Sequence, residues 1–546
     1  MGYENGAGKK AGKARYNILM ITTDQEQSFT DIPDCVALPN RERIRKNAVA
    51  YRNFHVNTTP CGPSRSVIYT GQHTQKTGMF ANPNVPPHVE LPRDMPTLGS
   101  IFRSLGYYTA YKGKWHLSNL NHGVNFDAQR YPQTVDELEP WGFSEYTHDG
   151  DHHGIVWDGF KHDGAIAADT ANWLLGLDGR RPTDQPWLMC ANFVNPHDIM
   201  FFDATGTMKD ERLDPLRVAP CKPAPFSKLY AERLPHRLPD SFVDTLADKP
   251  QAHRSDQRLA DMMYGRLPRT DEASWLNHLN YYYNCIRDVD RHIGTVLDAL
   301  QQSGEAENTI VVFTSDHGEM AGAHGMRQKG ASMYKEVVNV SLFIDHPDVS
   351  QSHESEHLAS SVDIVPTLLE LTGIEASDYH SLWPDLVGVA LTDTLSGEQS
   401  ERDKRGMLLN YTCKMAWDLD IVEALFTGQT RGEFTAEEGA RLGQGVSLQN
   451  LACFRGIHDG RYKFARYFKP AEHHHPADWQ TLLAHNELEL YDTVEDPLEV
   501  DNLAVAAEDH RPLIERLNKQ LNELIKAEIG IDDGSCYSKN GEYTLR

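Results

Sequence analysis

The segment from residue 58 to 71, TTPCGPSRSVIYTG, combines a thiol with a fixed positive charge. Pro63 suits the first turn of a helix, which places Cys61 at the start of that helix. The backbone N–H groups and the helix dipole would then face Cys61, and Arg65 would add a positive charge. The sequence therefore predicts an anion site. A buried structural cysteine beside a surface arginine is the alternative interpretation.

Two acidic residues follow short apolar runs that have the pattern of buried strands. Asp24 follows the run at residues 17–23, and Asp316 follows the run at residues 309–314. Helical patterns between these runs predict a doubly wound α/β fold, in which ligands bind at the carboxyl ends of parallel strands. Asp24 and Asp316 are expected at such ends, although a strand-end aspartate also serves simply to cap a loop.

The run Cys61-Gly62-Pro63-Ser64-Arg65, followed by Thr70-Gly71, resembles the signature of the type I sulfatases in the alkaline phosphatase superfamily. The resemblance implies that Cys61 is oxidised to formylglycine by a formylglycine-generating enzyme. The hydrated aldehyde would then be the nucleophile in place of the thiol. It also implies an alkaline phosphatase-like mixed, mostly parallel sheet flanked by helices.

The same resemblance implies one divalent metal ion, with Ca²⁺ expected first and Mn²⁺ or Mg²⁺ as alternatives. Its ligands would be Asp24, Gln25, modified Cys61, Asp316 and His317. Gln25 stands where many sulfatases have a second aspartate, and His317 stands where many have asparagine. An imidazole nitrogen favours a borderline metal more than an amide oxygen does. Both departures resemble the choline sulfatase and phosphonate monoester hydrolase branches.

Three further segments resemble catalytic parts of the family. In Gly113-Lys114-Trp115-His116-Leu117, Lys114 would hold a sulfate oxygen and His116 would act as a base. His197 follows a predicted strand, and Lys329 lies downstream of Asp316; the two would form the leaving-group side. The alternatives are a surface turn around Lys114 and a purely structural histidine at 197.

These residues predict an arylsulfatase-like sulfuric ester hydrolase acting on small-molecule sulfate esters. The first alternative is a phosphonate monoester hydrolase or phosphodiesterase on the same scaffold, which the residues at 25 and 317 favour. The second is a non-catalytic anion-binding relative that keeps Cys61 as a thiol.

Composition narrows the classes of partner. The 546-residue chain has 53 Lys and Arg against 78 Asp and Glu, a net charge of −25, which disfavours nucleic acid as a partner. Its apolar runs are too short to span a bilayer. Residues 1–15 lack the apolar stretch of a secretory signal and are expected to form a flexible tail. With eight scattered cysteines and no CxxC pair, the protein is expected to be cytoplasmic.

The pattern of elements also suggests how the chain is divided. Residues 16–400 are expected to form the catalytic domain, with residues 202–268 as an irregular insertion. Residues 401–546 are expected to form a smaller α+β subdomain with an antiparallel sheet, followed by a tail. A homo-oligomer is also expected.

Two histidine clusters fall outside the family pattern. Residues 148–153 with His162 and Asp163 are interpreted as a polar rim loop, with a role in the substrate pocket or a metal site as the alternatives. Residues 473–475, three consecutive histidines, are interpreted as a solvated loop that can chelate adventitious metal.

Overall fold

The structure is a computed structural model that describes residues 16–84, 89–120, 137–146, 150–211, 221–349, 352–413, 418–423, 448–472 and 475–537. Its centre is a seven-stranded sheet in the order β3-β4-β1-β5-β6-β2-β7. The strands are β1 (Asn17–Asp24), β2 (Val49–His55), β3 (Tyr108–Gly113), β4 (Trp187–Pro196), β5 (Thr309–Ser315), β6 (Leu342–Asp345) and β7 (His353–Ser360). Only β6 runs against its neighbours β5 and β2. The predicted mostly parallel α/β fold is confirmed.

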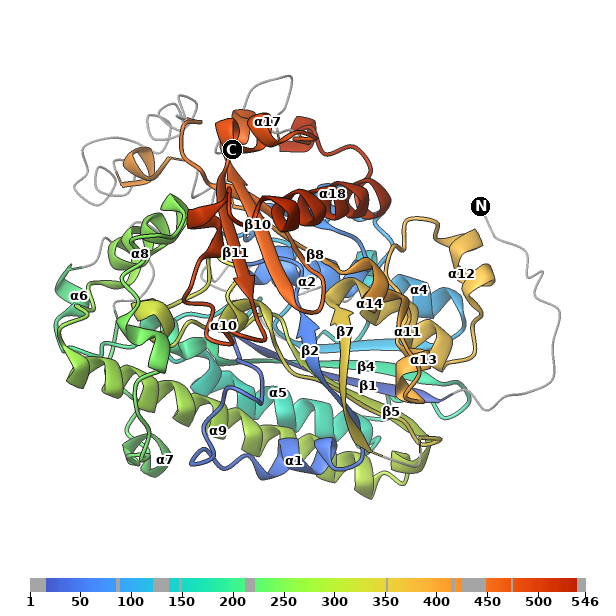
Figure 1. Cartoon of the computed structure of the whole chain (residues 1–546). Coiled ribbons are helices and arrows are strands. Elements are labelled where there is room, and N and C mark those ends of the chain that lie inside the picture. Colours follow the sequence, from blue (N-terminus) through green and yellow to red (C-terminus); the bar gives the residue numbers. More distant parts are fainter. Residues whose placement is uncertain are drawn as a thin grey trace.

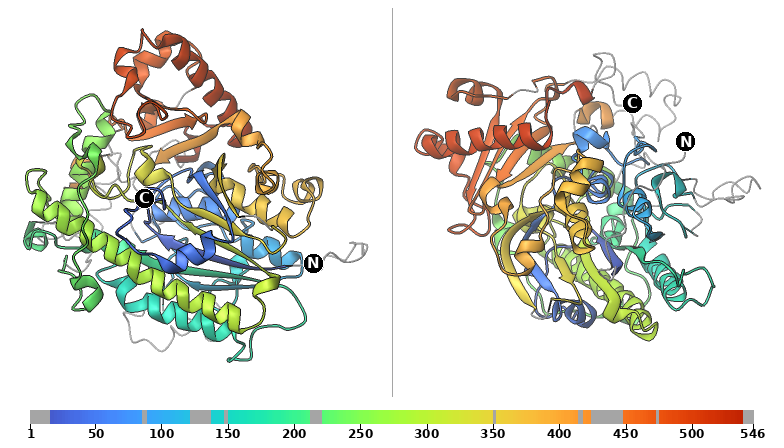
Figure 2. Two further views of the ribbon diagram at one scale, coloured as in Figure 1. Left: turned by 60° about the horizontal axis from the view of Figure 1, so that its bottom comes forward. Right: turned by 90° about the vertical axis from the view of Figure 1, so that its right-hand side faces the viewer.

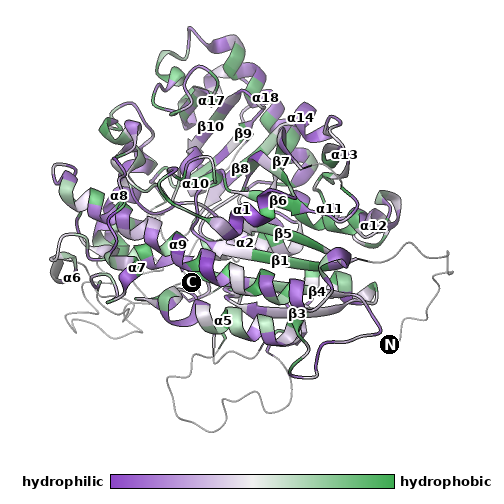
Figure 3. Ribbon diagram, turned by 90° about the horizontal axis from the view of Figure 1, so that it is seen from below, coloured by the Kyte–Doolittle hydropathy of each residue, from purple (hydrophilic) through white to green (hydrophobic). Residues whose placement is uncertain are grey.

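Helices cover both faces of this sheet (Figure 1). Leu19 and Ile21 of β1 pack with α1 (Pro39–Arg45), α5 (Asp158–Leu174) and α9 (Glu272–Gln302). Ile18 and Met20 face the other way, toward α2 (Cys61–Thr70), α4 (Leu98–Ser104) and α11 (Ile364–Leu371). Because successive strand residues point to opposite faces, one wholly apolar strand serves both layers. Viewed from the side of α5 and α9, apolar residues of the strands lie behind helices with polar outer faces (Figure 3).

The segment at residues 202–268, predicted to be irregular, contains α8 (Gln251–Tyr264) together with short helices. Among these are α6 (Met208–Glu211) and α7 (Lys228–Ala231). Tyr230, Phe242 and Leu267 of the segment pack against Tyr281 and other residues of α9, forming a separate apolar cluster. The described part of this segment is therefore anchored to α9 by apolar packing.

The C-terminal part forms a second, antiparallel sheet in the order β11-β10-β9-β8 (Figure 2). Its strands are β8 (Met407–Thr412), β9 (Cys453–His458), β10 (Tyr462–Phe468) and β11 (Glu487–Asp492). Helix α18 (Arg511–Glu528) buries Leu517 and Leu521 against Phe464 and Leu490 of this sheet. Within the described residues, no helix combines the length and apolarity needed to cross a membrane.

Candidate active site

Cys61 is the first residue of α2, a helix whose ten residues are all buried. Its Sγ lies 3.1 Å from Nε2 of His317 and 3.7 Å from Oδ1 of Asp24. The backbone N–H of Gly62 donates to Asn82 Oδ1 at 2.9 Å, which fixes the loop opposite the helix start. The thiol therefore sits at a helix N-terminus, as predicted, and it touches residues from two other segments.

Those segments are the ends of β1 and β5. The two strands pair in parallel with Thr23 opposite Ser315, so Asp24 and Asp316 emerge at the same edge of the sheet. The ligand atoms of Asp24, Cys61, Asp316 and His317 all lie within 4.8 Å of one another, and all four residues are buried. His317 Nδ1 lies 2.9 Å from the Gly318 carbonyl, which can only accept a hydrogen bond. Nε2 therefore presents its lone pair to the cluster.

The electrostatics of the two carboxylates differ. Burial would raise the pKa of Asp24, but the positive charge of Lys114 holds that pKa well below its usual value. Burial, together with the charge of Asp24, raises the pKa of Asp316 to about 7. Two carboxylates and an imidazole lone pair converge here on one buried point. A divalent cation matches this donor set and would relieve the repulsion between the carboxylates.

Two basic side chains border the cluster. Lys114 Nζ lies 2.5 Å from Asp24 Oδ2 and donates to the His153 carbonyl at 2.7 Å. Arg65 Nε lies 3.3 Å from Asp316 Oδ2, and the guanidinium is completely buried. Within the described residues, Nη2 of Arg65 has no hydrogen-bond partner. A buried, unpaired donor next to a second cation is the arrangement that an oxyanion ligand satisfies.

His116 has a geometry suited to accepting a proton. Its backbone has a φ of +57° and its N–H donates to Asp151 Oδ2 at 2.7 Å. Nε2 lies 3.0 Å from Asn84 Oδ1, while Nδ1 has no partner within the described residues. Burial and the charge of Lys114 lower the pKa of His116 well below its usual value. The imidazole is therefore neutral at neutral pH.

His197 and Lys329 line one cavity beside the cluster. His197 begins η2 (His197–Phe201) directly after β4, and burial with the charges of Lys114 and Lys329 lowers its pKa well below the usual value. Lys329 Nζ donates to Gln25 Oε1 and lies 2.9 Å from Met200 Sδ. His197 is thus neutral, so Lys329 is the more suitable proton donor of the pair.

Gln25 is held between two partners. Its Oε1, the atom expected to bind the metal, accepts from Lys329, and its Nε2 donates to Glu319 Oε2 at 2.5 Å. Its backbone has a φ of +70° and its N–H donates to Asp316 Oδ1 at 3.2 Å. Glu319 did not figure among the predicted site residues, although it lies in the segment that follows Asp316. Its role depends on contacts across the fold, which no local pattern reveals.

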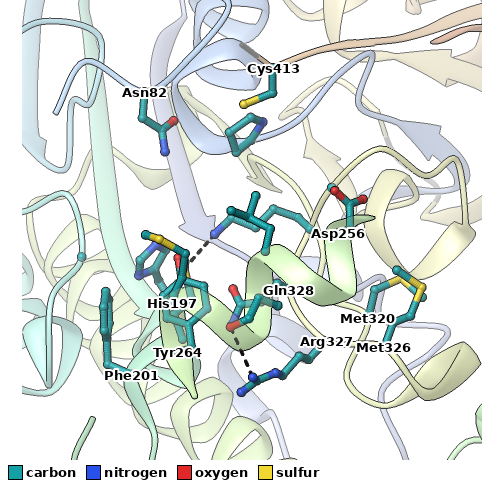
Figure 4. Close-up of a pocket in the computed structure, with 18 of the residues that line it drawn as sticks. Asn82, His197, Phe201, Asp256, Tyr264, Met320, Met326, Arg327, Gln328 and Cys413 are labelled. Carbon is teal, nitrogen blue, oxygen red and sulfur yellow. Dashed lines mark hydrogen bonds between the residues drawn. The ribbon is translucent and has the colours of Figure 1, made fainter. Parts of the chain in front are cut away.

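A cavity of about 160 Å³ adjoins these residues, and His116, His197 and Lys329 line it. The other walls come from distant segments: Phe201 after β4, Tyr264 of α8, and Met320, Met326 and Gln328 after β5 (Figure 4). Leu259 and Met263 of α8 add further apolar surface. The site thus combines a buried polar end with a largely apolar chamber.

This fold and site define a hydrolase of alkaline phosphatase-like architecture. Residues 17–374 match the Sulfatase family model, so the chain belongs to the sulfatase family and is a sulfuric ester hydrolase. An uncharacterized sulfatase of Escherichia coli is 26% identical over 76% of this chain and 80% of its own length. A choline-sulfatase of Rhizobium meliloti is 26% identical over 70% of this chain and 72% of its own.

Among solved structures, the phosphonate monoester hydrolase of Agrobacterium radiobacter superimposes with a TM-score of 0.61. It is 20% identical, and the match covers 97% of this chain and 100% of that one. This likeness shows the shared fold. The resemblance to the sulfatase family, including its choline sulfatase and phosphonate monoester hydrolase branches, is confirmed.

Proposed function

We propose that the protein hydrolyses sulfate monoesters with a compact aryl leaving group, using a formylglycine made from Cys61 and one divalent cation. The observation that carries this proposal is the buried convergence of Asp24, Cys61, Asp316 and His317 beside Arg65 and Lys114. A sulfate monoester resists attack because its oxygens repel a nucleophile. Fixed positive charges and a helix N-terminus reduce that repulsion without reorganisation.

Asp24, Asp316 and His317, with an oxygen of modified Cys61, would hold the cation. Gln25 is kept as a proposed ligand, and its oxygen would have to exchange Lys329 for the ion. When bound, the cation would act as a Lewis acid toward the ester and the nucleophile. The carboxylates suit Ca²⁺, our first expectation, whereas His317 would favour Mn²⁺ over Mg²⁺ as the alternative.

The chain's own residues would then move the protons. The hydrated formylglycine would supply the attacking oxygen. Asp316 would accept the proton of the attacking hydroxyl, and Lys329 would protonate the leaving oxygen as its bond to sulfur breaks. His116 Nδ1 would accept the proton of the second hydroxyl as sulfate departs and the aldehyde reforms. Asp316 and His116 would then return their protons, one to Lys329 and one to solvent, and addition of water would restore the hydrate.

The cavity supports the aryl preference. Its volume of about 160 Å³ is close to the roughly 150 Å³ of an engineered apolar cavity that binds benzene. Met200, Phe201 and Tyr264 line it, so a single ring would be desolvated beside Lys329. An aryl oxygen is also a better leaving group than an alkyl oxygen, which matches a site whose His197 is neutral.

A direct comparison of an aryl sulfate with the matching aryl phosphonate ester tests the substrate class. We expect kcat/KM to be higher for the sulfate. Phosphonate monoester hydrolysis is our second candidate, since Gln25 and His317 leave less negative charge around the cation and the fold is shared. Phosphonate turnover that exceeds sulfate turnover by orders of magnitude would replace the first proposal with the second.

Mass spectrometry of the Cys61 peptide tests the nucleophile. Replacement of the thiol by an aldehyde makes the residue roughly 18 Da lighter. We expect this shift in protein from the native host, made by a maturation enzyme, and we expect Cys61→Ala to lower kcat by about 10⁴-fold or more. Cys453→Ala, at a buried cysteine of β9, is the matched control and should remain active. An unmodified Cys61 together with absent turnover would indicate a non-catalytic anion-binding relative.

A further inference from the structure

Three side chains outside the proposed catalytic cluster converge at the start of α5. His152 lies in the segment that precedes the helix, Asp158 is its first residue, and His162 lies one turn later. Their ligand atoms all lie within 4.8 Å of one another. Asp158 is buried, whereas His152 and His162 are partly exposed, with 38% of the His162 side chain accessible. An ion can therefore reach them from solvent.

The distances suit a small transition-metal ion. Asp158 Oδ1 lies 3.4 Å from His152 Nδ1 and 3.6 Å from His162 Nε2. Ligands of tetrahedral Zn²⁺, bound at about 2.0–2.1 Å, lie about 3.3 Å apart. The two imidazole rings stack with centroids 3.9 Å apart and planes at 20°. Two rings stacked in this way repel each other when both are protonated. The lone pair of a neutral imidazole nitrogen lies in the ring plane, so binding of one shared ion would turn one of the two rings about its side-chain torsions.

The carboxylate of Asp158 is already oriented. Its Oδ2 accepts the backbone N–H of Gly154 at 3.0 Å, which directs Oδ1 toward the two histidines. Such a second hydrogen bond is what fixes carboxylate ligands in metal sites. Two nitrogens and one oxygen are a ligand set for Zn²⁺ and similar borderline ions, with further positions for water.

We propose that His152, Asp158 and His162 form a second metal site, specific for a borderline divalent transition metal such as Zn²⁺, distinct from the Asp24–His317 cluster. The ion fastens the segment at residues 151–154 to α5. That segment contacts the proposed catalytic residues directly. The His153 carbonyl accepts from Lys114, and the Gly154 backbone lies against the His197 ring. Asp151 accepts the N–H of His116. The second ion is therefore a structural element that positions the active site.

Zinc binding to the full-length protein, after treatment with a chelator, tests this proposal. We expect His162→Gln and His152→Gln each to bind one zinc ion fewer per chain than the wild type by calorimetry and elemental analysis. Co²⁺ should give the d–d absorption of a tetrahedral site in the wild type, and this absorption should be lost in both variants. His162 is partly exposed, so its variant should fold, and circular dichroism without metal checks this.

His474→Gln, in the histidine run at residues 473–475, is the control for adventitious binding. It should bind as many ions as the wild type. Hydrogen exchange at residues 151–154 should slow on addition of Zn²⁺ in the wild type and remain unchanged in His162→Gln. Equal zinc stoichiometry in the wild type and both cluster variants, or loss of an ion only in His474→Gln, would overturn the proposal. Zinc stoichiometry, Co²⁺ absorption and hydrogen exchange can all be measured without catalytic turnover.

Discussion

At the scale of single residues, the site depends on contacts that leave no free space. A Cβ added at Gly154, which has a φ of +103°, would lie 2.2 Å from Nδ1 of His197. Gly318 likewise lies against the Glu336 carbonyl, where a Cβ would come within 2.0 Å. The glycines next to these catalytic candidates are therefore part of the site geometry, because any side chain there would displace a proposed catalytic group or its support.

Gly154→Ala should displace His197 and lower kcat/KM for aryl sulfates by about 10²-fold, the usual cost of a displacement of about 1 Å at a reacting group. Gly179→Ala is the matched control. Gly179 also has positive φ, at +70°, but no atom lies within 4 Å of its added Cβ. It should lose about 1 kcal/mol of stability and retain activity. Equal activity in the two variants would contradict the proposed role of His197.

The pH dependence follows from His116. Burial and the charge of Lys114 lower its pKa well below 6.5, so the neutral form that accepts a proton persists when the pH falls through 6.5. We expect no histidine-dependent loss of kcat between pH 8 and 6.5 in pH–rate profiles. An acidic limb near pH 6.5 that disappears in His116→Asn would show that His116 titrates normally and would refute this assignment.

At the scale of elements, the sequence predicted the strands that carry the site better than the rest of the sheet. The apolar runs at residues 17–23 and 309–314 became β1 and β5 almost without change. Strand β7, HESEHLAS, was missed because it lies at the sheet edge and carries charged residues on its exposed positions. The start of helix α5 at Asp158 could not be read from the sequence, because glycines and histidines obscure its first turn.

The candidate site was predictable where a residue type is tied to a local motif, as at Cys61, Arg65 and Lys114. It was not predictable where partners come from opposite ends of the chain. Glu319 accepts from Gln25 Nε2 and also from the N–H of Gln328 at 2.6 Å. These contacts join the end of β1 to the segment that carries Lys329. Only the pairing of β1 with β5 brings them together.

Glu319→Gln should loosen this connection. We expect a loss of about 2 kcal/mol in the free energy of unfolding, because a buried charged acceptor of several N–H groups is replaced by an amide. Release of Gln25 and Lys329 should also lower kcat for aryl sulfates. Urea denaturation and steady-state kinetics measure both effects. The exposed Glu307→Gln serves as the control, and identical behaviour of the two variants would contradict the proposed connection.

At the scale of the whole molecule, the C-terminal sheet supports the catalytic layer. Lys463 of β10 donates to the Met333 carbonyl and pairs with Glu499 at 2.5 Å. Glu499 in turn accepts the N–H of Lys335 at 2.8 Å. The segment between residues 329 and 335 is thus held from the second sheet. Buried Arg402 adds a second connection, pairing with Asp363 beside α11 and with Glu528 of α18.

Arg402→Met should destabilise the protein by about 3–5 kcal/mol, because Asp363 and Glu528 would remain as buried, uncompensated charges. The exposed Lys404→Met should change stability by less than about 0.5 kcal/mol. Arg402 and His73 lower the pKa of Glu528 to about 2 despite its burial, so its contribution is present above pH 4.5 and is lost as the pH falls toward 2. Urea titrations of both variants measure the difference. Equal urea midpoints for Arg402→Met and Lys404→Met would show that the ion pairs of Arg402 with Asp363 and Glu528 do not hold the two sheets together.

The burial of Cys61 has a consequence for how the protein is made. Its side chain has no exposed surface, and Glu528, which pairs with His73 just beyond α2, is synthesised long after Cys61. A maturation enzyme cannot reach the thiol once these parts have closed. The proposed conversion therefore has to occur on the nascent or unfolded chain, before α18 leaves the ribosome and docks. Slower translation between residues 61 and 528 should then increase the converted fraction, which makes catalytic competence a matter of timing during synthesis.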